Sequence, residues 1–257
     1  MNSCGPFSIV LGFGQFAINE PDKSMTSQSK PIELYYFPTP NGKKISIMLE
    51  ELGVPYSVHF VHIGRGDQFK PEFLAISPNN RIPAIVDPEG PDGEPISVFE
   101  SGAILQYLGD KFGRFYPRDA RKRTEVNQWL MWQMGGFGPM LGQNHHFVQY
   151  APEQIPYAID RYVNETHRLY GVLNKQLEGK NYICGEFSIA DIACIGWALG
   201  HERQRMDISE FPNVRDWIDR MQARPGVAAG LAVKGDDSAD KPLRDDDQAK
   251  KVLFGQK

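Results

Sequence analysis

The sequence predicts an α/β domain followed by an all-helical domain, and two observations favour this fold class. Residues 31–113 alternate short apolar runs with helical repeats, whereas apolar residues from about 120 to 231 recur at helical spacing. The chain has 257 residues, of which 41% are hydrophobic. That content is enough to bury a large core, and it fits one two-domain protein better than several small domains.

The first domain is expected over residues 31–113. Its predicted elements are strand Ile32–Phe37, helix Lys43–Leu52, strand Tyr56–Ile63, a short helix Pro71–Ile76, strands Ile82–Val86 and Ile96–Phe99, and helix Ser101–Phe112. Turn residues fill the segment between the last two strands, residues 87–93. Strand-helix-strand followed by strand-strand-helix is the order of a thioredoxin-like domain.

A linker at residues 114–119, which contains Pro117, leads to the predicted helical domain, residues 120–234. A first helix begins near Ala120 and is expected to bend at residues 135–139, because glycine and proline weaken a helix. Further helices are predicted over residues 152–177 and 212–223. Between them, Ser188 and Asp191 form a capping box with aspartate in the acidic position.

The two ends of the chain fall outside these domains. Residues 1–30 form an extension without the basic region and cleavage site of a signal peptide, and Met25 is a possible internal start. The segment 12–17 matches a loose dinucleotide fingerprint, but Pro21 and the polar run after it leave no room for the required helix. Residues 235–257 are charged and are expected to be a mobile tail.

Composition excludes several classes of function. A formal net charge of −4 gives no electrostatic case for nucleic acid, and no run of 18 apolar residues is present to span a membrane. Cys4, Cys184 and Cys194 are widely spaced and fit neither a disulfide framework nor a zinc site, which indicates a reducing, cytoplasmic setting. His145 and His146 point about 100° apart on a helix, so no metal site is expected there.

The segment Phe37-Pro38-Thr39-Pro40-Asn41-Gly42 carries the first chemical signal. It closes the first strand and opens an amphipathic helix with a hydroxyl, an amide and a bare backbone. Free N–H groups and the positive end of the helix dipole gather at such a terminus and favour an anion such as a thiolate. Thr39 and Asn41 are therefore candidates for holding a sulfur anion.

Two later motifs make the chain resemble the glutathione transferase superfamily. They are residues 79–87, which include Ile82-Pro83, and residues 96–105, which include Glu100-Ser101 at the start of a helix. The resemblance is closest to the nu-class group of bacterial glutathione-dependent disulfide-bond oxidoreductases, through Thr-Pro-Asn-Gly at 39–42, Gly-Asp-Gln-Phe at 66–69, Ser-Pro-Asn-Asn at 77–80 and the string at 138–147. It covers about residues 31–231.

The resemblance implies a glutathione transferase fold and a set of ligand contacts. In that family the Ile-Pro bond is cis and presents the backbone of the preceding residue to glutathione. By the same carry-over, the residues expected to bind glutathione are Asn41, Gln68, Ile82 through its backbone, Glu100, Ser101 and, from the second domain, Arg161. Two glutathione molecules, or one glutathione disulfide, are expected in the site, and the protein is expected to form a homodimer without a metal.

The expected activity is glutathione-dependent reduction of disulfide bonds, and also of organic hydroperoxides. Relatives of the glutaredoxin type carry cysteine at the first turn, where this chain has Thr39-Pro40-Asn41, so the reactive sulfur must be that of glutathione. Two alternatives stay open: a transferase that conjugates hydrophobic electrophiles, and a non-enzymatic glutathione-binding regulator. The second substrate cannot be read from the sequence.

Overall fold

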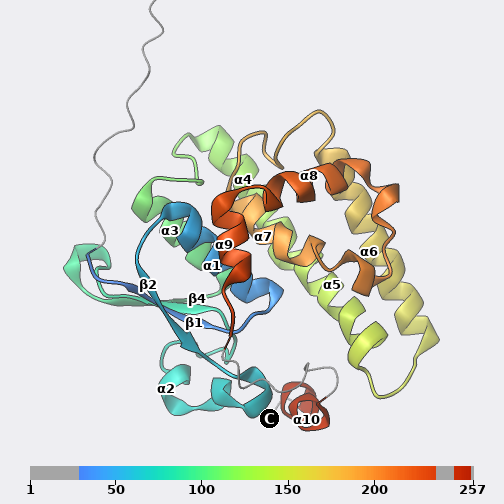
Figure 1. Cartoon of the computed structure of the whole chain (residues 1–257), viewed down its shortest axis with the longest axis horizontal. Coiled ribbons are helices and arrows are strands. Elements are labelled where there is room, and N and C mark those ends of the chain that lie inside the picture. Colours follow the sequence, from blue (N-terminus) through green and yellow to red (C-terminus); the bar gives the residue numbers. More distant parts are fainter. Residues whose placement is uncertain (1–28, 236–245, 256–257) are drawn as a thin grey trace, which may run out of the picture.

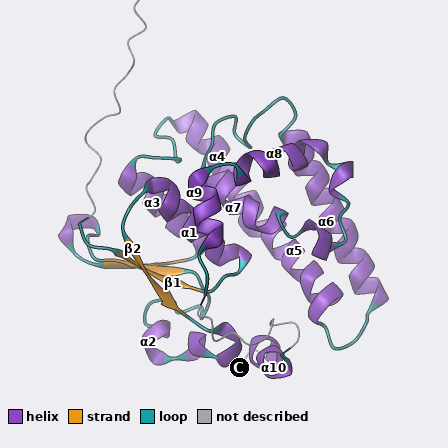
Figure 2. Cartoon of the chain, viewed as in Figure 1, coloured by secondary structure: helices purple, strands orange, loops and turns teal. Residues whose placement is uncertain are grey.

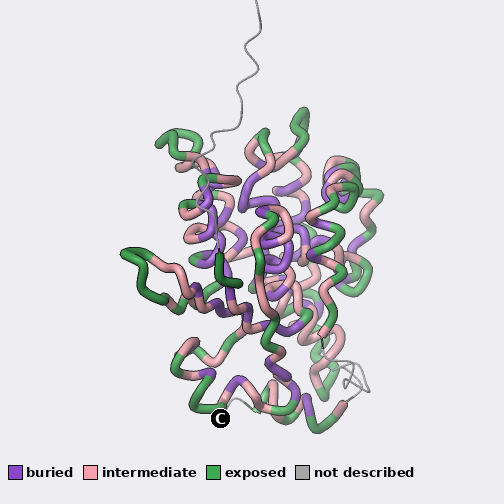
Figure 3. The backbone as a smooth tube through the Cα atoms, turned by 60° about the vertical axis from the view of Figure 1, so that its left-hand side comes forward, coloured by how far each residue is buried: buried purple, intermediate pink, exposed green. Residues whose placement is uncertain are grey.

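A computed structural model of the chain describes residues 29–235 and 246–255, and Figure 1 shows a small sheet domain beside a larger helical domain. Residues 1–28, with Cys4 and Met25, lie outside the described part, so the expectations for the N-terminal extension stay predictions. Figure 3 shows buried segments gathered in the interior and exposed segments at the periphery. The predicted fold class is confirmed.

The sheet has four strands in the order β2-β1-β3-β4. These are β1 (Ile32–Tyr36), β2 (Tyr56–Phe60), β3 (Ala84–Asp87) and β4 (Ile96–Phe99). β1 is parallel to β2 and antiparallel to β3, which is antiparallel to β4. This is the predicted thioredoxin-like arrangement. β2 ends three residues earlier than expected, because the chain turns into two 3₁₀ helices, η1 (Ile63–Arg65) and η2 (Asp67–Phe69).

Helices cover both faces of the sheet. α1 (Pro40–Leu52) and α3 (Ser101–Phe112) lie between the sheet and the second domain, and the short α2 (Pro71–Leu74) lies on the other side (Figure 1). The alternation of β1 explains the two layers, because Ile32, Leu34 and Tyr36 are buried toward α1 while Tyr35 points the other way and packs with Phe73 of α2.

Outside the sheet domain the described chain is helical (Figure 2). Between residues 120 and 232 its α-helices are α4 (Ala120–Trp132), α5 (Gly138–His145), α6 (Pro156–Gln176), α7 (Ile189–Ala198), α8 (Pro212–Gln222) and α9 (Pro225–Ala232). Two π-turns, η4 (Gln133–Phe137) and η5 (His146–Tyr150), flank α5, and 3₁₀ turns η6 (His201–Gln204) and η7 (Ile208–Glu210) precede α8. The bend predicted at residues 135–139 is thus a π-turn that keeps the helix continuous.

The capping box of α7 is confirmed. Ser188 accepts a hydrogen bond from the backbone of Ala190, and Asp191 accepts one from the backbone N–H of Ser188 at 3.0 Å. Asp191 also accepts from the backbone of Ile183 and from the indole of Trp217. Because its side chain is fully buried, burial raises the pKa of Asp191 to about 6, against the effect of these donors.

The two domains meet along α1. Gly230 of α9 lies so close to Ile47 that an added Cβ would be 2.4 Å from the Ile47 Cα, and the hydroxyl of Ser46 donates to the Gly230 carbonyl at 2.7 Å. At the end of α1, Glu51 is bound by both arms of the Arg224 guanidinium, at 2.9 and 2.7 Å. α1 therefore lies within the first domain in the sequence, but it also packs against the helices of the second domain.

The C-terminal tail differs from the expectation. Residues 247–255 form helix α10 (Asp247–Gly255), which packs against η1 of the first domain. The ring of Phe254 also contacts the rings of His146 and Tyr150 in η5, at centroid distances of 4.8 and 5.7 Å. The apolar residues of this segment gave no helical signal in the sequence, because the charges around them dominate the composition. Among the described helices, none is both long and apolar enough to cross a membrane.

Candidate functional site

The strand register brings most of the predicted site residues to one edge of the sheet. Tyr36 of β1 is opposite Phe60 of β2, and Ala84 of β3 is opposite both Tyr35 and Phe99. The segments that leave β1, β2 and β4 and the segment that enters β3 therefore share this edge. They contain Thr39 and Asn41, Gln68, Glu100 and Ser101, and Ile82 respectively.

The turn from β1 into α1 is built around Thr39 and Gly42. Thr39 caps the helix by accepting a hydrogen bond from the backbone N–H of Gly42 at 3.1 Å, and Pro40 occupies the first helical position. Only glycine fits at 42, since an added Cβ would lie 2.1 Å from the Phe37 carbonyl oxygen. The cap uses the lone pair of the Thr39 hydroxyl, so its hydrogen remains available to a ligand.

Asn41 is held by a residue of the second domain. Its Oδ1 accepts a hydrogen bond from the indole Nε1 of Trp197 in α7 at 3.0 Å. The Asn41 side-chain nitrogen makes no hydrogen bond with any residue in the described ranges, and the residue is partly exposed. The predicted thiolate-binding turn thus presents a hydroxyl and an amide at the N-terminus of α1, where the helix dipole favours negative charge.

A buried lysine connects this helix to Ser101. Lys44 is 1% exposed, and its ammonium donates to Gln133 Oε1 at 2.8 Å and to Ser101 Oγ at 3.3 Å. Burial lowers the pKa of Lys44 to about 7. Because the ammonium is a donor only, Ser101 must accept from it. The Ser101 hydroxyl itself donates to the sulfur of Met134 at 3.7 Å.

Glu100 precedes Ser101 in a backbone conformation that side chains rarely adopt. Its φ and ψ are 68° and 114°, at the cap position of α3, and its side chain makes no capping hydrogen bond. The carboxylate instead accepts from Asn79 Nδ2 at 3.3 Å and is exposed at the sheet edge. Backbone strain of this kind is concentrated at functional sites in proteins.

Ile82 and Gln68 complete the edge. The Ile82-Pro83 peptide bond is cis, as the resemblance implied, and Ile82 lies two residues before β3, outside the strand ladder. Gln68 is 3% exposed, and its amide donates to the Ile63 carbonyl at 3.0 Å, so it supports η1. Its Oε1 is buried and finds no hydrogen-bond partner within the described ranges.

Arg161 is the one predicted residue that the structure does not join to the others. It lies exposed on α6 in the second domain and, among the described residues, makes no hydrogen bond or ion pair with the other six candidates. Its role in binding a ligand carboxylate therefore stays a prediction.

Tyr36 and the two described cysteines, Cys184 and Cys194, are poor nucleophiles. The Tyr36 hydroxyl is bound to the Val233 carbonyl at 3.0 Å, and burial raises its pKa. Cys194 is fully buried in α7, and burial raises the pKa of its thiol well above the ordinary value. Burial also raises the pKa of the Cys184 thiol, to about 12. Neither described cysteine matches the activated thiol of a redox protein.

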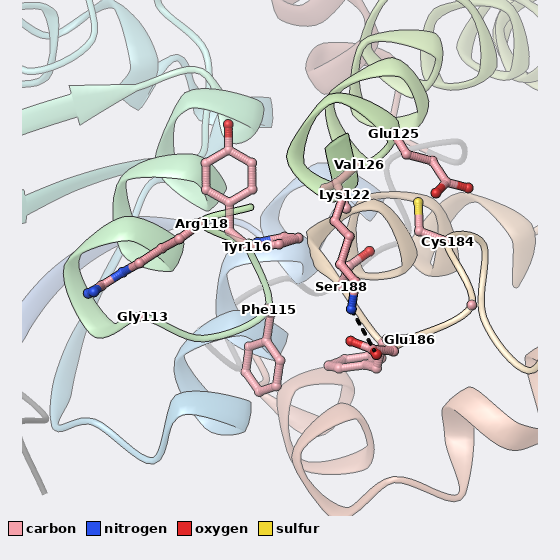
Figure 4. Close-up of a pocket in the computed structure, with 13 residues that line it drawn as sticks. Gly113, Phe115, Tyr116, Arg118, Lys122, Glu125, Val126, Cys184, Glu186 and Ser188 are labelled. Carbon is pink, nitrogen blue, oxygen red and sulfur yellow. Dashed lines mark hydrogen bonds and ion pairs between the residues drawn. The ribbon is translucent and has the colours of Figure 1, made fainter. Parts of the chain in front are cut away.

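Cys184 instead lines a separate cavity of about 400 Å³ beside the interdomain linker (Figure 4). Phe115 and Tyr116 from the linker form one wall, and the segment around Glu186 forms the other. Lys122 and Glu186 are among its lining residues and form an ion pair at 3.4 Å (Figure 4). None of the seven predicted site residues lines this cavity.

Comparison with known proteins identifies the family. Residues 39–111 match the glutathione S-transferase N-terminal domain, and residues 145–225 match the C-terminal domain. The chain is 54% identical over 213 residues to the disulfide-bond oxidoreductase YfcG of Escherichia coli, an alignment that covers 81% of this chain and 99% of that protein. The chain belongs to the glutathione transferase family.

Two solved structures resemble this glutathione transferase in fold and sequence. The first, a glutathione transferase from Burkholderia graminis with two glutathione molecules bound per subunit, has a TM-score of 0.75 and 48% identity over 80% of this chain and 89% of that one. The second, from Pseudomonas putida with one glutathione disulfide bound per subunit, has a TM-score of 0.77 and 44% identity over 82% and 94%. The resemblance read from the sequence is confirmed.

Trp197 and Lys44 were not singled out in the sequence of this glutathione transferase. Lys44 lies four residues before Met48 and shares the buried side of α1, so a charge at a core position was a visible signal. Trp197 lies in an apolar helix 156 residues from Asn41, and no local pattern links the two.

Proposed function

We propose that this protein is a glutathione-dependent disulfide-bond reductase that uses the thiolate of bound glutathione. The supporting observation is the turn at the N-terminus of α1, where two donors, the Thr39 hydroxyl and the Asn41 amide, lie beside the backbone N–H of Asn41 at the positive end of the helix dipole. No cysteine lies at this turn, and both described cysteines are buried or have a raised pKa. The nucleophile is therefore supplied by the ligand.

The reaction has two exchange steps. Hydrogen bonds from Thr39 and Asn41 stabilise the thiolate of the first glutathione, which attacks one sulfur of the substrate disulfide. A mixed disulfide forms, and the other substrate sulfur leaves as a thiolate and takes up a proton. The thiolate of a second glutathione then attacks the glutathione sulfur of the mixed disulfide, which yields glutathione disulfide and the second reduced thiol.

The bound states of the relatives support this stoichiometry. The Burkholderia structure holds two glutathione molecules and the Pseudomonas structure holds one glutathione disulfide, which correspond to the reductant and the oxidised product of this reaction. YfcG is itself named a disulfide-bond oxidoreductase. In the proposed site, Glu100 and Ser101 bind the amino-acid end of glutathione, Ile82 pairs with its backbone, and Gln68 and Arg161 hold the remaining polar groups.

Three further expectations belong to this proposal. The same thiolate reduces organic hydroperoxides, because attack on the terminal oxygen gives an alcohol and a glutathione sulfenic acid, and a second glutathione converts the latter to glutathione disulfide and water.

The protein acts in the cytoplasm, where glutathione is reduced. It forms a homodimer, which light scattering of the purified protein measures.

The test compares two activities on one enzyme preparation. We expect reduction of a small model disulfide by glutathione to exceed the uncatalysed rate by orders of magnitude, and conjugation of an aryl halide to be slow. The Thr39→Ala, Asn41→Ala double variant should lose disulfide reduction while it still binds glutathione through the other residues. Fast conjugation with negligible disulfide reduction would instead assign the protein to the conjugating transferases.

A further inference from the structure

The helix that carries Trp197 makes an unusually close contact with the turn of α1. An added Cβ on Gly196 would lie 2.8 Å from the Pro40 carbonyl oxygen, so only glycine permits this approach. The next residue, Trp197, is 9% exposed and points its indole N–H at Asn41. The sequence of α7 thus delivers one aromatic donor to one amide of the site.

The motif at residues 138–147 in the second domain shapes the place of this indole. An added Cβ on Gly142 would lie 3.3 Å from the far edge of the Trp197 ring, whereas one on Gly138 would first meet the Gln133 side chain, 2.6 Å from its Nε2. The ring of His145 lies at a centroid distance of 5.9 Å from that of Trp197. Gly142 of α5 therefore leaves room for the ring, and the aromatic ring of His145 packs on it.

The chemistry of the indole decides which way the Asn41 amide faces. An indole N–H is a donor only, so the Asn41 atom that faces it must be the carbonyl oxygen. The amide –NH₂ then has to face away from Trp197, toward the open side of the turn. Without this bond the amide could rotate by 180° and present its oxygen to the ligand, and a carbonyl oxygen repels a thiolate.

We infer that Trp197 is a positioning residue that orients the Asn41 amide to donate to the glutathione sulfur. This inference rests on the proposed function, since it requires a thiolate at the turn. It gives the helical domain a direct part in the chemistry of a site built otherwise from the first domain. It also assigns a purpose to Gly142 of α5, which makes room for the indole.

The experiment measures the thiolate absorbance of bound glutathione against pH in the wild type and in Trp197→Phe, which keeps an aromatic ring but lacks the donor. We expect the pKa of bound glutathione to rise by roughly one unit, and the pH–rate profile of disulfide reduction to move alkaline by the same amount. Affinity for S-methylglutathione, which cannot form a thiolate, should change less than twofold.

Trp217→Phe is the matched control. The Trp217 indole donates to the carboxyl group of Asp191 at 3.0 Å, so the donor and the length of the bond match those of Trp197, but Trp217 lies in the core away from the turn. This variant should lower the melting temperature without moving the glutathione pKa. If Trp197→Phe fails to fold, replacement of Trp197 by its benzothiophene analogue, which has sulfur in place of the N–H, removes the donor and preserves the shape.

Two titratable protein groups lie near the turn, and neither is substituted in these variants. Burial, with a smaller effect from Arg203, lowers the pKa of His145 to about 4, so it stays neutral across the measured range. Burial lowers the pKa of Lys44 to about 7, and this residue is also present in every variant.

Asn41→Ala separates the two hypotheses. If Asn41→Ala raises the glutathione pKa but Trp197→Phe leaves it at the wild-type value, the inference about Trp197 is wrong and the proposed function stands. If Asn41→Ala does not move the pKa, the thiolate role of the turn is wrong, and the inference falls with it. In the Asn41→Ala background, Trp197→Phe should produce no additional shift.

Discussion

Lys44 joins three elements of the fold through its hydrogen bonds, and its burial removes a charged group from water. Its ammonium is buried at the junction of α1, α3 and the π-turn η4, and it meets three neutral acceptors, on Gln133, Ser101 and the sulfur of Met134. Neutral acceptors compensate only part of the lost hydration, and for this reason burial lowers its pKa to about 7. The sequence shows the charge in a core position but does not show what lies opposite it.

The pH dependence of stability follows from that lowered pKa. Between about pH 7 and pH 10 the unfolded chain keeps the Lys44 proton that the folded protein releases, so this group makes the free energy of unfolding rise with pH. Relative to Lys44→Met, the wild type should gain up to about 1.4 kcal/mol per pH unit across this range. Urea denaturation at pH 6.5, 8 and 9.5 measures it.

Lys175→Met provides the control, because Lys175 is exposed on α6. The difference between wild type and this variant should be flat over the same pH range. A difference between wild type and Lys44→Met that is equally flat would mean that Lys44 keeps its proton in the folded protein, and the argument from burial would then be wrong.

At the scale of elements, sequence patterns predicted those helices and strands that are set by interactions between residues close in the sequence. The capping box of α7, the strand Ile96–Phe99 and the helix Ser101–Phe112 all have the bounds or contacts expected from their residues. The turn at 39–42 was also predicted, because threonine, proline and glycine each have a defined place in a helix start. Contacts between elements were not, because hydrophobic periodicity gives a buried face but not its partner.

The contact between α7 and the turn of α1 supports a prediction about helix packing. Gly196→Ala places a methyl group 2.8 Å from the Pro40 carbonyl oxygen, which is backbone and cannot rotate away. We expect the free energy of unfolding to fall by about 1–3 kcal/mol, as for other overpacked cores. Disulfide reduction should fall at least tenfold at pH 7, because α7 carries Trp197 away from Asn41.

Gly171→Ala is the matched control for this prediction. Gly171 also lies inside a helix, α6, but an added Cβ would have nothing within 4 Å. The substitution should leave activity unchanged and stabilise the protein by up to about 1 kcal/mol, since alanine is the better helix former. The measurement compares the melting curves and the rates of disulfide reduction of the two variants. Equal melting temperatures and equal rates would refute a tight contact at Gly196.

At the scale of the whole molecule, the candidate site is formed by residues of both domains. The first domain supplies the strand edge and the helix N-termini, and the second supplies Trp197 and Gln133. The candidate residues of the first domain, and Arg161 of the second, were expected through the family resemblance, which rests on short motifs, and their binding roles stay predictions. The contact between Trp197 and Asn41 was not predicted, because a separation of 156 residues leaves no spacing signal.

The distribution of cysteines over the whole molecule leads to the last prediction. Cys184 lines the linker cavity, Cys194 is fully buried in α7, and Cys4 lies outside the described residues. We expect a variant with Cys4→Ser, Cys184→Ser and Cys194→Ala to retain at least half the wild-type kcat/KM for disulfide reduction, because the reacting sulfur belongs to glutathione. Alanine at 194 avoids burying a hydroxyl in an apolar core.

Circular dichroism and a glutathione binding measurement confirm that the cysteine-free protein is folded before its rate is interpreted. Asn41→Ala serves as the opposite case, with all three cysteines present and one thiolate donor removed, and its activity at pH 7 should fall about tenfold or more. If the folded cysteine-free protein were inactive while Asn41→Ala stayed active, a protein thiol would be the nucleophile. The turn at Thr39 and Asn41 would then be only a helix cap.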